Sequence, residues 1–183
     1  MIWRVGLTDI DVTDVVFFDE CGINLAMTPT YAWSLKGQRA PGSAPKNWGD
    51  SVTVAAGLSL REGIVAPLQL LGSMDGVHFE AYLEQFLLPQ MRPGQFLVLD
   101  NLGAHKTVAA REACRKAGVW LVFLPPYSPD LNPIEKAWSK LKSLLRRAAA
   151  RTLKDLEREL AVALRAIRPC DALGWFRSSG LAV

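Results

Sequence analysis

Three acidic residues stand out in this sequence because each lies where a fold can hold a side chain rigidly. Asp19 ends the apolar run VVFF, Asp100 ends the run FLVL, and Glu135 follows the proline-rich stretch PPYSPDLNPI. A buried carboxylate is costly unless it is paired or bound to a metal. Carboxylate oxygens suit Mg²⁺, and a pair of divalent ions can activate a hydroxyl and neutralise the leaving oxygen in phosphodiester chemistry. We therefore interpret the three acids as a metal-binding triad.

Two strand ends and one helix start are expected to position these acids. The apolar runs before Asp19 and Asp100 are typical of buried strands. Asn132 at a cap position and Pro133 at the first helical position indicate a helix that begins just before Glu135. The 34 residues between Asp100 and Glu135 hold one helical pattern, one apolar strand and a turn. That length suits a helical crossover to a parallel neighbouring strand, so Glu135 can return beside Asp100.

The remaining pattern predicts an α/β fold in which strands come first, helices and strands then alternate, and helices close the chain. Thr152 is expected to cap the second closing helix, with Asp155 three positions on. Trp138 is expected in the core, on an apolar stripe with Ile134, Leu141 and Leu145. This order is that of a ribonuclease H-like fold, a mixed central sheet flanked by helices, although many mixed folds share it. Strands are predicted at 15–19, 31–36, 51–59, 64–71, 95–100 and 119–124, and helices at 77–90, 107–117, from 133 and from 152.

Two motifs, DNLGAHK and PPYSPDLNPIEKAW, together with their spacing, resemble the catalytic core of DDE transposases. The resemblance extends over residues 15–180 and points to the bacterial insertion-sequence branch of the mariner-related superfamily. It implies that Asp19 is the central bridging ligand, and that Asp100 and Glu135 each hold one of two Mg²⁺ ions, with Mn²⁺ as a substitute. The implied activity is DNA cleavage by water followed by strand transfer by the freed 3′-hydroxyl.

The resemblance also implies a domain division and partners. Residues 1–14 are expected to form a short leader, and residues 15–183 the ribonuclease H-like catalytic domain. Members of the family carry an N-terminal helix-turn-helix region that recognises transposon ends, and this region does not fit into the leader. We therefore expect the chain to act on transposon ends and target DNA as a homodimer, with a separately encoded helix-turn-helix domain as a further partner.

Composition excludes several other classes of protein. The length of 183 residues fits one domain that can bury a sizeable core without disulfides. Cys21, Cys114 and Cys170 are odd in number and lack zinc-ligand spacing, which is typical of reduced thiols in a cytoplasm. No apolar run is long enough to span a membrane, and no basic segment leads into an apolar core as in an export signal. These features predict a cytoplasmic protein, and the resemblance implies a prokaryotic one near the nucleoid.

Charge is divided unevenly along the chain. Residues 1–100 hold 6 Lys/Arg and 11 Asp/Glu, whereas residues 101–183 hold 15 and 7. The basic half is the expected DNA-facing surface, although a solvated surface is an equal alternative. Contacts of these side chains with phosphates would set affinity and salt dependence without reading sequence. The candidates for DNA binding are His105, Lys106, Lys136, Lys140, Lys142, Arg146 and Arg147.

Two of the three acids also have a purely structural alternative. Glu135 could return a hydrogen bond to the backbone of the capping residue, and Asp100 could accept backbone hydrogen bonds in the turn after its strand. Glu20 should point to the face opposite Asp19, so only one of the two can join the triad. Since clustered carboxylates repel one another, we expect Asp100→Asn to leave the metal-free fold intact or more stable.

Three functions compete at this stage. The first is the catalytic domain of a DNA transposase, present as a fragment or as one part of a split element. The second is a ribonuclease H-like nuclease that acts on structured or hybrid nucleic acid with the same metals. The third is a non-catalytic remnant that only pairs with an intact transposase. The two motifs favour the first, because they resemble the transposase branch.

Overall fold

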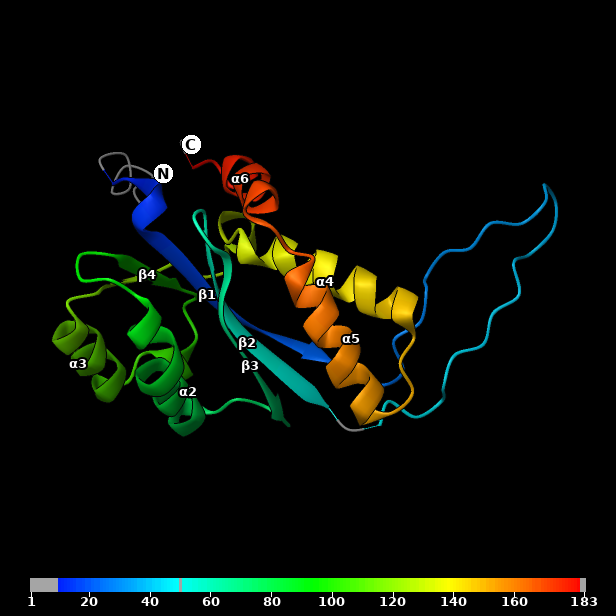
Figure 1. Cartoon of the computed structure of the whole chain (residues 1–183), viewed down its shortest axis with the longest axis horizontal. Coiled ribbons are helices and arrows are strands. Elements are labelled where there is room, and N and C mark those ends of the chain that lie inside the picture. The colour runs from blue at the N-terminus through cyan, green and yellow to red at the C-terminus, as the bar shows by residue number, and fades with distance from the viewer. Residues whose placement is uncertain (1–9, 50, 182–183) are drawn as a thin grey trace.

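A mixed five-stranded sheet forms the centre of the molecule (Figure 1). The computed structural model describes residues 10–49 and 51–181. In the strand order β3-β2-β1-β4-β5, the first three strands are antiparallel neighbours, whereas β4 runs parallel to β1 and β5 runs parallel to β4. The strands are β1 (Val15–Ile23), β2 (Val52–Ser59), β3 (Gly63–Leu71), β4 (Phe96–Leu99) and β5 (Trp120–Phe123).

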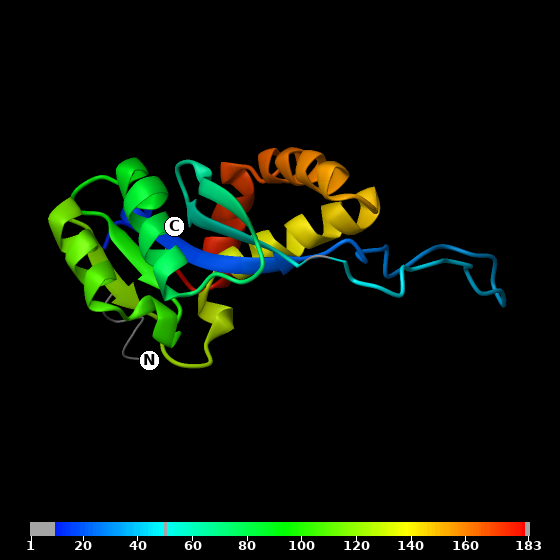
Figure 2. The same ribbon diagram turned by 90° about the horizontal axis from the view of Figure 1, so that it is seen from below.

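Helices cover both faces of this sheet (Figures 1 and 2). One face packs against α4 (Ile134–Ala148), α5 (Leu153–Arg165) and α6 (Pro169–Ser178), and the other against α2 (Gly76–Tyr82) and α3 (Val108–Ala117). The predicted α/β architecture of a mixed sheet with flanking helices is confirmed. The short helical turns are η1 (Val12–Asp14), η2 (Leu83–Leu87), η3 (Leu88–Gln90), η4 (Gly103–His105) and η5 (Pro129–Leu131).

The central strand β1 is buried on both faces, which explains its unbroken apolar run. Alternate side chains enter different cores: Phe17 makes an edge contact with Phe176 of α6, and Phe18 packs against Phe79 of α2, each at 5.3 Å between ring centroids. This alternation continues to the end of the strand. Adjacent acids at Asp19 and Glu20 are therefore sent to opposite faces of the sheet.

The strand predicted at 31–36 is wrong. Residues 24–49 instead form an arm that projects from the body between β1 and β2 (Figures 1 and 2). Trp33 of this arm is fully exposed. The base of the arm is closed by a hydrogen bond from the Leu25 amide to the Trp48 carbonyl (3.1 Å) and by Arg151, which donates to carbonyls on this segment. Alternating apolar residues do not form a strand here because no neighbouring strand pairs with them.

The helix predicted at 77–90 is divided. It begins as α2, widens into the π-helical turn η2 and ends as the 3-10 turn η3, which contains Pro89. Phe79, Leu83 and Leu87 are buried, but Phe86 is 41% exposed because the change of helical period moves it off the apolar face.

The predicted leader is described only in part, and the predicted cap of α5 is present. Residues 1–9 of the predicted leader lie outside the described residues, and η1 directly precedes β1. Thr152 caps α5 by accepting a hydrogen bond from the Asp155 amide (3.1 Å), as predicted. Among the helices of the described residues, none is long and apolar enough to cross a membrane.

Candidate active site

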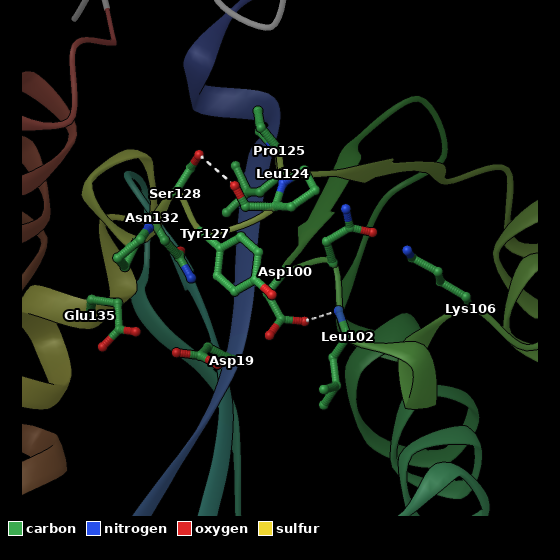
Figure 3. A pocket seen from close by; sticks show the side chains of 13 residues that line it. Asp19, Asp100, Leu102, Lys106, Leu124, Pro125, Tyr127, Ser128, Asn132 and Glu135 are labelled. Atoms are coloured by element: carbon green, nitrogen blue, oxygen red, sulfur yellow. Dashed lines mark hydrogen bonds between the residues drawn. The ribbon is translucent and has the colours of Figure 1, made fainter.

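Asp19, Asp100 and Glu135 line one cavity of about 510 Å³ (Figure 3). The register of the parallel pair β1 and β4 explains why the first two meet. Phe17 lies opposite Val98, so Asp19 and Asp100, each two residues further, reach the same level in the sheet. Asp100 directly follows β4, whereas β1 continues beyond Asp19 to Ile23, so the strand end predicted at residue 19 is wrong. Glu135 comes from the first turn of α4, which packs on β1. The three acids that the sequence indicates therefore line one cavity.

Asp19 enters the cavity from the α4 face of β1. Its Oδ2 accepts a hydrogen bond from the indole nitrogen of Trp138 at 3.2 Å. Burial, followed by the negative charges of Glu135, Glu20 and Asp100, raises the pKa of Asp19 to about 7. The carboxyl group is thus poised between its neutral and charged forms near neutral pH.

Trp138 is buried, as predicted, but its contact with Asp19 was not foreseen. A signal was present in the sequence, because Trp138 follows Glu135 by three positions. Residues at this spacing lie on the same face of a helix. Glu135 and Trp138 therefore approach the end of β1 together.

Asp100 is held by two hydrogen bonds to a single oxygen. The Leu102 amide donates to Oδ1 at 3.0 Å, and His105 Nδ1 lies 2.7 Å from the same atom. Burial opposes ionisation, but the hydrogen bonds from His105 and Leu102 outweigh it and lower the pKa of Asp100. Oδ2 receives no hydrogen bond from the described residues. The structural role considered for Asp100, acceptance of a backbone hydrogen bond in the turn after its strand, is therefore observed at Oδ1. Oδ2 remains available as a ligand.

His105 lies in η4 between two carboxylates and is only 1% exposed. Its Nε2 lies 3.1 Å from Glu20 Oε1, on the opposite side of the ring from Asp100. Burial lowers the pKa of His105, but the hydrogen bonds to Asp100 and Glu20 raise it to a net value of about 9. The DNA contact predicted for His105 conflicts with this burial, because both ring nitrogens face carboxylates inside the protein.

The start of α4 places Glu135 without the predicted side-chain cap. Asn132 has an extended backbone and Pro133 a helical one (φ −64°, ψ −23°), in agreement with the predicted boundary. However, the Asn132 side chain makes no cap hydrogen bond, and its buried Oδ1 has no partner among the described residues. The Asn132 amide donates to the Pro129 carbonyl (3.0 Å), not to Glu135. The capping alternative for Glu135 is therefore not observed, and its carboxylate is exposed at the cavity.

The candidate DNA-binding residues fall into two groups. Lys106 is exposed, lines the cavity and holds its ammonium 5.8 Å from the Phe123 ring centroid. Lys140, by contrast, forms an ion pair with Asp171 at 2.6 Å, and Lys136 donates to Ser179 Oγ at 3.3 Å. These two lysines of α4 are thus directed at α6 and its end, against the prediction of DNA contacts. Of the others, Lys142 and Arg146 are half-buried and Arg147 is exposed.

The donor set fits a hard divalent ion, but the side chains do not converge as they stand. Within residues 10–49 and 51–181, no group of three or more His, Cys, Asp or Glu side chains is close enough to hold a metal ion. The acids around the cavity offer oxygen ligands alone, which suits Mg²⁺ and Mn²⁺. Burial, followed by the negative charges of neighbouring acids, raises the pKa of Asp19, and a bound cation would favour its charged form again.

Comparison with known proteins identifies the family. Residues 14–157 match the sequence model of the family described as DDE superfamily endonuclease. This stretch covers most of the chain and contains all three acids of the cavity. A search of the curated proteins found no match.

Solved structures of low sequence identity share the fold. The mariner Mos1 paired end complex with Mg matches with a TM-score of 0.73 and 16% identity, covering 98% of this chain and 57% of that one. The Mos1 strand transfer complex matches with a TM-score of 0.69 and 18% identity, over 92% and 51% of the two chains. The catalytic core domain of BIV integrase gives 0.50 and 16%, over 84% and 82%. The fold is therefore the ribonuclease H-like fold of transposase and integrase catalytic cores, and the chain spans just over half of these Mos1 chains.

Proposed function

We propose that this chain, which belongs to the DDE superfamily of endonucleases, is the catalytic domain of a DNA transposase that cuts DNA and joins the freed 3′ end to a target. The observation that carries the proposal is the arrangement of three carboxylates, Asp19, Asp100 and Glu135, around one cavity. The Mos1 structures named above are a strand transfer complex and a paired end complex, and they share the fold of this chain. That likeness supports a similar task here.

In this proposal Asp19 is the central ligand of a divalent-ion pair, flanked by Asp100 and Glu135. Bound Mg²⁺ or Mn²⁺ would activate the attacking oxygen and neutralise the charge on the leaving oxygen. Trp138 holds one oxygen of Asp19, and two donors hold one oxygen of Asp100, so these two carboxylates have a fixed orientation. Placement on two strands of the sheet and on a helix start gives the precision that a metal site requires.

DNA is the proposed substrate, and Lys106 is the basic residue best placed to meet it, since it is exposed beside the cavity. The chain spans just over half of the Mos1 chains, and recognition of transposon ends by a helix-turn-helix domain is part of the proposal. We also propose that the chain acts on DNA as a homodimer. It is proposed to belong to the bacterial insertion-sequence branch and to act in the prokaryotic cytoplasm.

The decisive experiment is strand transfer by the purified chain. A pre-cleaved oligonucleotide with a 3′-hydroxyl is incubated with plasmid and Mg²⁺ or Mn²⁺, and joined products are counted for the parent and for Asp19→Asn, Asp100→Asn and Glu135→Gln. Asp75→Asn is the matched control, because Asp75 is exposed at the start of α2 and does not line the cavity. We expect joining by the parent and the control and its loss in the other three.

Two results would change the assignment. Joining that persists in any of the three cavity variants would remove that acid from the triad. Metal-dependent cleavage of an RNA–DNA hybrid without any joining would instead favour a ribonuclease H-like nuclease.

A further inference from the structure

Glu20 follows Asp19 directly in β1, yet it reaches the site from the other face of the sheet. Asp19 lies on the α4 face against Trp138, whereas Glu20 contacts His105 of η4 at 3.1 Å. Of the Glu20 side chain, 18% is exposed. Glu20 therefore does not join the carboxylates in the cavity directly, but it can act on Asp100 through a residue between them.

The residue between Glu20 and Asp100 is His105. Nδ1 of the ring lies 2.7 Å from Asp100 Oδ1, while Nε2 faces Glu20. The ring itself is fixed by aromatic neighbours, with the Phe79 ring at 4.5 Å and the Phe18 ring at 5.6 Å between centroids. Because the ring contacts both carboxylates, a shift of Glu20 would move the ring and, through it, the carboxylate of Asp100.

The consequence for Asp100 is a defined orientation. Its Oδ1 accepts from both the Leu102 amide and His105, so rotation about the side-chain bonds would break two hydrogen bonds at once. Oδ2 is thereby left facing the cavity that Asp19 and Glu135 also line (Figure 3). Without Glu20, the imidazole would lose its anchor on the Nε2 side.

We propose that Glu20 and His105 are positioning residues, which act together to fix the carboxylate of Asp100 for its task. The inference rests on the proposed function of Asp100 as a metal ligand. It assigns a role to both acids of the Asp19-Glu20 pair: one reaches the cavity directly, and the other acts through His105. Partners of metal ligands in other proteins change metal affinity or activity by about 10- to 100-fold when removed.

The first test measures the coupling without any metal. The parent, Glu20→Ala and Glu20→Gln are compared by NMR, with the His105 ring nitrogens and the Asp100 side-chain carboxyl carbon as probes. The chain has only two histidines, and the other, His78, forms an exposed pair with Asp75 at 2.8 Å. Asp75→Asn is therefore a matched control for the loss of a His-bound acid elsewhere.

Glu20→Ala should move the resonances of both His105 and Asp100, Glu20→Gln should move them less because it keeps an acceptor oxygen, and Asp75→Asn should leave them in place. An Asp100 resonance that stays unchanged in Glu20→Ala would overturn the inference. If that variant does not fold, Glu20→Gln is the variant to measure, and unchanged His105 and Asp100 resonances there would overturn it equally.

The second test measures Mn²⁺ binding to the free protein by electron paramagnetic resonance, together with strand transfer over a range of Mn²⁺ concentrations. Glu20→Ala should weaken Mn²⁺ binding about 10- to 100-fold, with most of the affinity restored in Glu20→Gln and strand transfer recovered at high Mn²⁺. Equal Mn²⁺ affinity in the parent and in folded Glu20→Ala would refute positioning. A parent that joins no DNA would count against the proposed function alone, because the NMR coupling is measured without catalysis.

Discussion

Asp19→Asn and Asp100→Asn remove the same charge from the same cavity, yet we expect them to change the stability of the metal-free protein in opposite directions. The pKa of Asp19 is raised to about 7, chiefly by burial, so the fold disfavours its charged form. Burial acts on Asp100 too, but hydrogen bonds from His105 and Leu102 outweigh it and lower its pKa. The fold therefore favours the charged form of Asp100.

The size of the Asp19 effect follows from its pKa. A rise from 3.8 to about 7, at 1.36 kcal/mol per pKa unit, corresponds to an upper bound of roughly 4 kcal/mol of free energy of unfolding. Asparagine keeps an oxygen that can accept from the Trp138 indole, so this contact need not be lost. With relaxation of the neighbours, we expect a gain of roughly 2 to 4 kcal/mol at pH 8, which raises Tm by roughly 5 to 10 °C in a domain of this size.

The pH dependence gives the prediction a sign that can be checked. Because the folded pKa of Asp19 lies above its unfolded value, the penalty is absent below about pH 4, grows between pH 4 and 7, and is complete above pH 7. The gain from Asp19→Asn should therefore shrink to roughly a third at pH 5. For Asp100, whose folded pKa is lowered, the stabilising contribution is complete above the unfolded pKa and is lost as pH falls through the folded value.

Asp100→Asn should destabilise the protein by about 1 to 2 kcal/mol at pH 8. An asparagine oxygen can still accept a hydrogen bond from the Leu102 amide. However, the substitution replaces the charged partner of His105 by a neutral one. The effect is kept modest because 42% of the Asp100 side chain is exposed and its charge is screened. This reverses the sequence-based expectation of an intact or more stable fold. Burial, followed by the charges of neighbouring carboxylates, dominates at Asp19, whereas hydrogen bonds outweigh burial at Asp100.

The assay is thermal and urea unfolding, followed by circular dichroism, in chelator at pH 8 and pH 5. Asp75→Asn serves again as the control for loss of an exposed acid. If Asp19→Asn were no more stable than the parent at pH 8, or if its gain did not shrink at pH 5, carboxylate repulsion in the cavity would be refuted. A stabilised Asp100→Asn would likewise refute the role given to its hydrogen bonds.

Three further predictions concern the surface. Lys106→Ala should weaken DNA binding and reduce the slope of log affinity against log salt by about 0.9, as expected for one phosphate contact, and an unchanged slope in a filter-binding titration would contradict this. Lys140→Ala should cost up to about 1 kcal/mol in urea unfolding with no change in DNA affinity, since Lys140 is paired with Asp171; a loss of DNA affinity would restore its predicted role. Replacing residues 29–46 of the arm by a short Gly/Ser linker should change the free energy of unfolding by less than about 1 kcal/mol, because these residues are almost all exposed. Loss of folding in this variant would show that the arm supports the core.

The positions of the three acids could be predicted because local pattern and chain topology agree there. Apolar runs identify β1 and β4, and a parallel pair brings the ends of its strands to one edge of the sheet. The strand predicted at 31–36 failed for the opposite reason. Tyr31, Trp33 and Leu35 alternate as in a half-buried strand, but alternation becomes a strand only where a neighbour supplies hydrogen bonds. Nothing in the local sequence reveals whether such a neighbour exists.

The directions of the lysines on α4 could not be predicted either. Their density indicates a basic surface, and the sequence contains no signal for the face of α4 that α6 covers. Lys136 and Lys140 are four positions apart and so lie on one face, and this is the face that meets Ser179 and Asp171. A charged residue on a helix can equally bind a phosphate or hold a neighbouring helix, and the choice is made by packing.

The link from Glu20 through His105 to Asp100 joins residues that the sequence separates by 85 and 5 positions. It explains why two adjacent acids can serve one cavity without crowding it. Asp19 bears the repulsion of its neighbours, and Trp138 supplies only one neutral donor. Asp100 is compensated by His105, whose own burial beside Phe18 and Phe79 is tolerable because Glu20 faces its second nitrogen. The negative charge of Glu20 therefore stabilises the ring that orients Asp100, and it also adds to the charges that raise the pKa of Asp19.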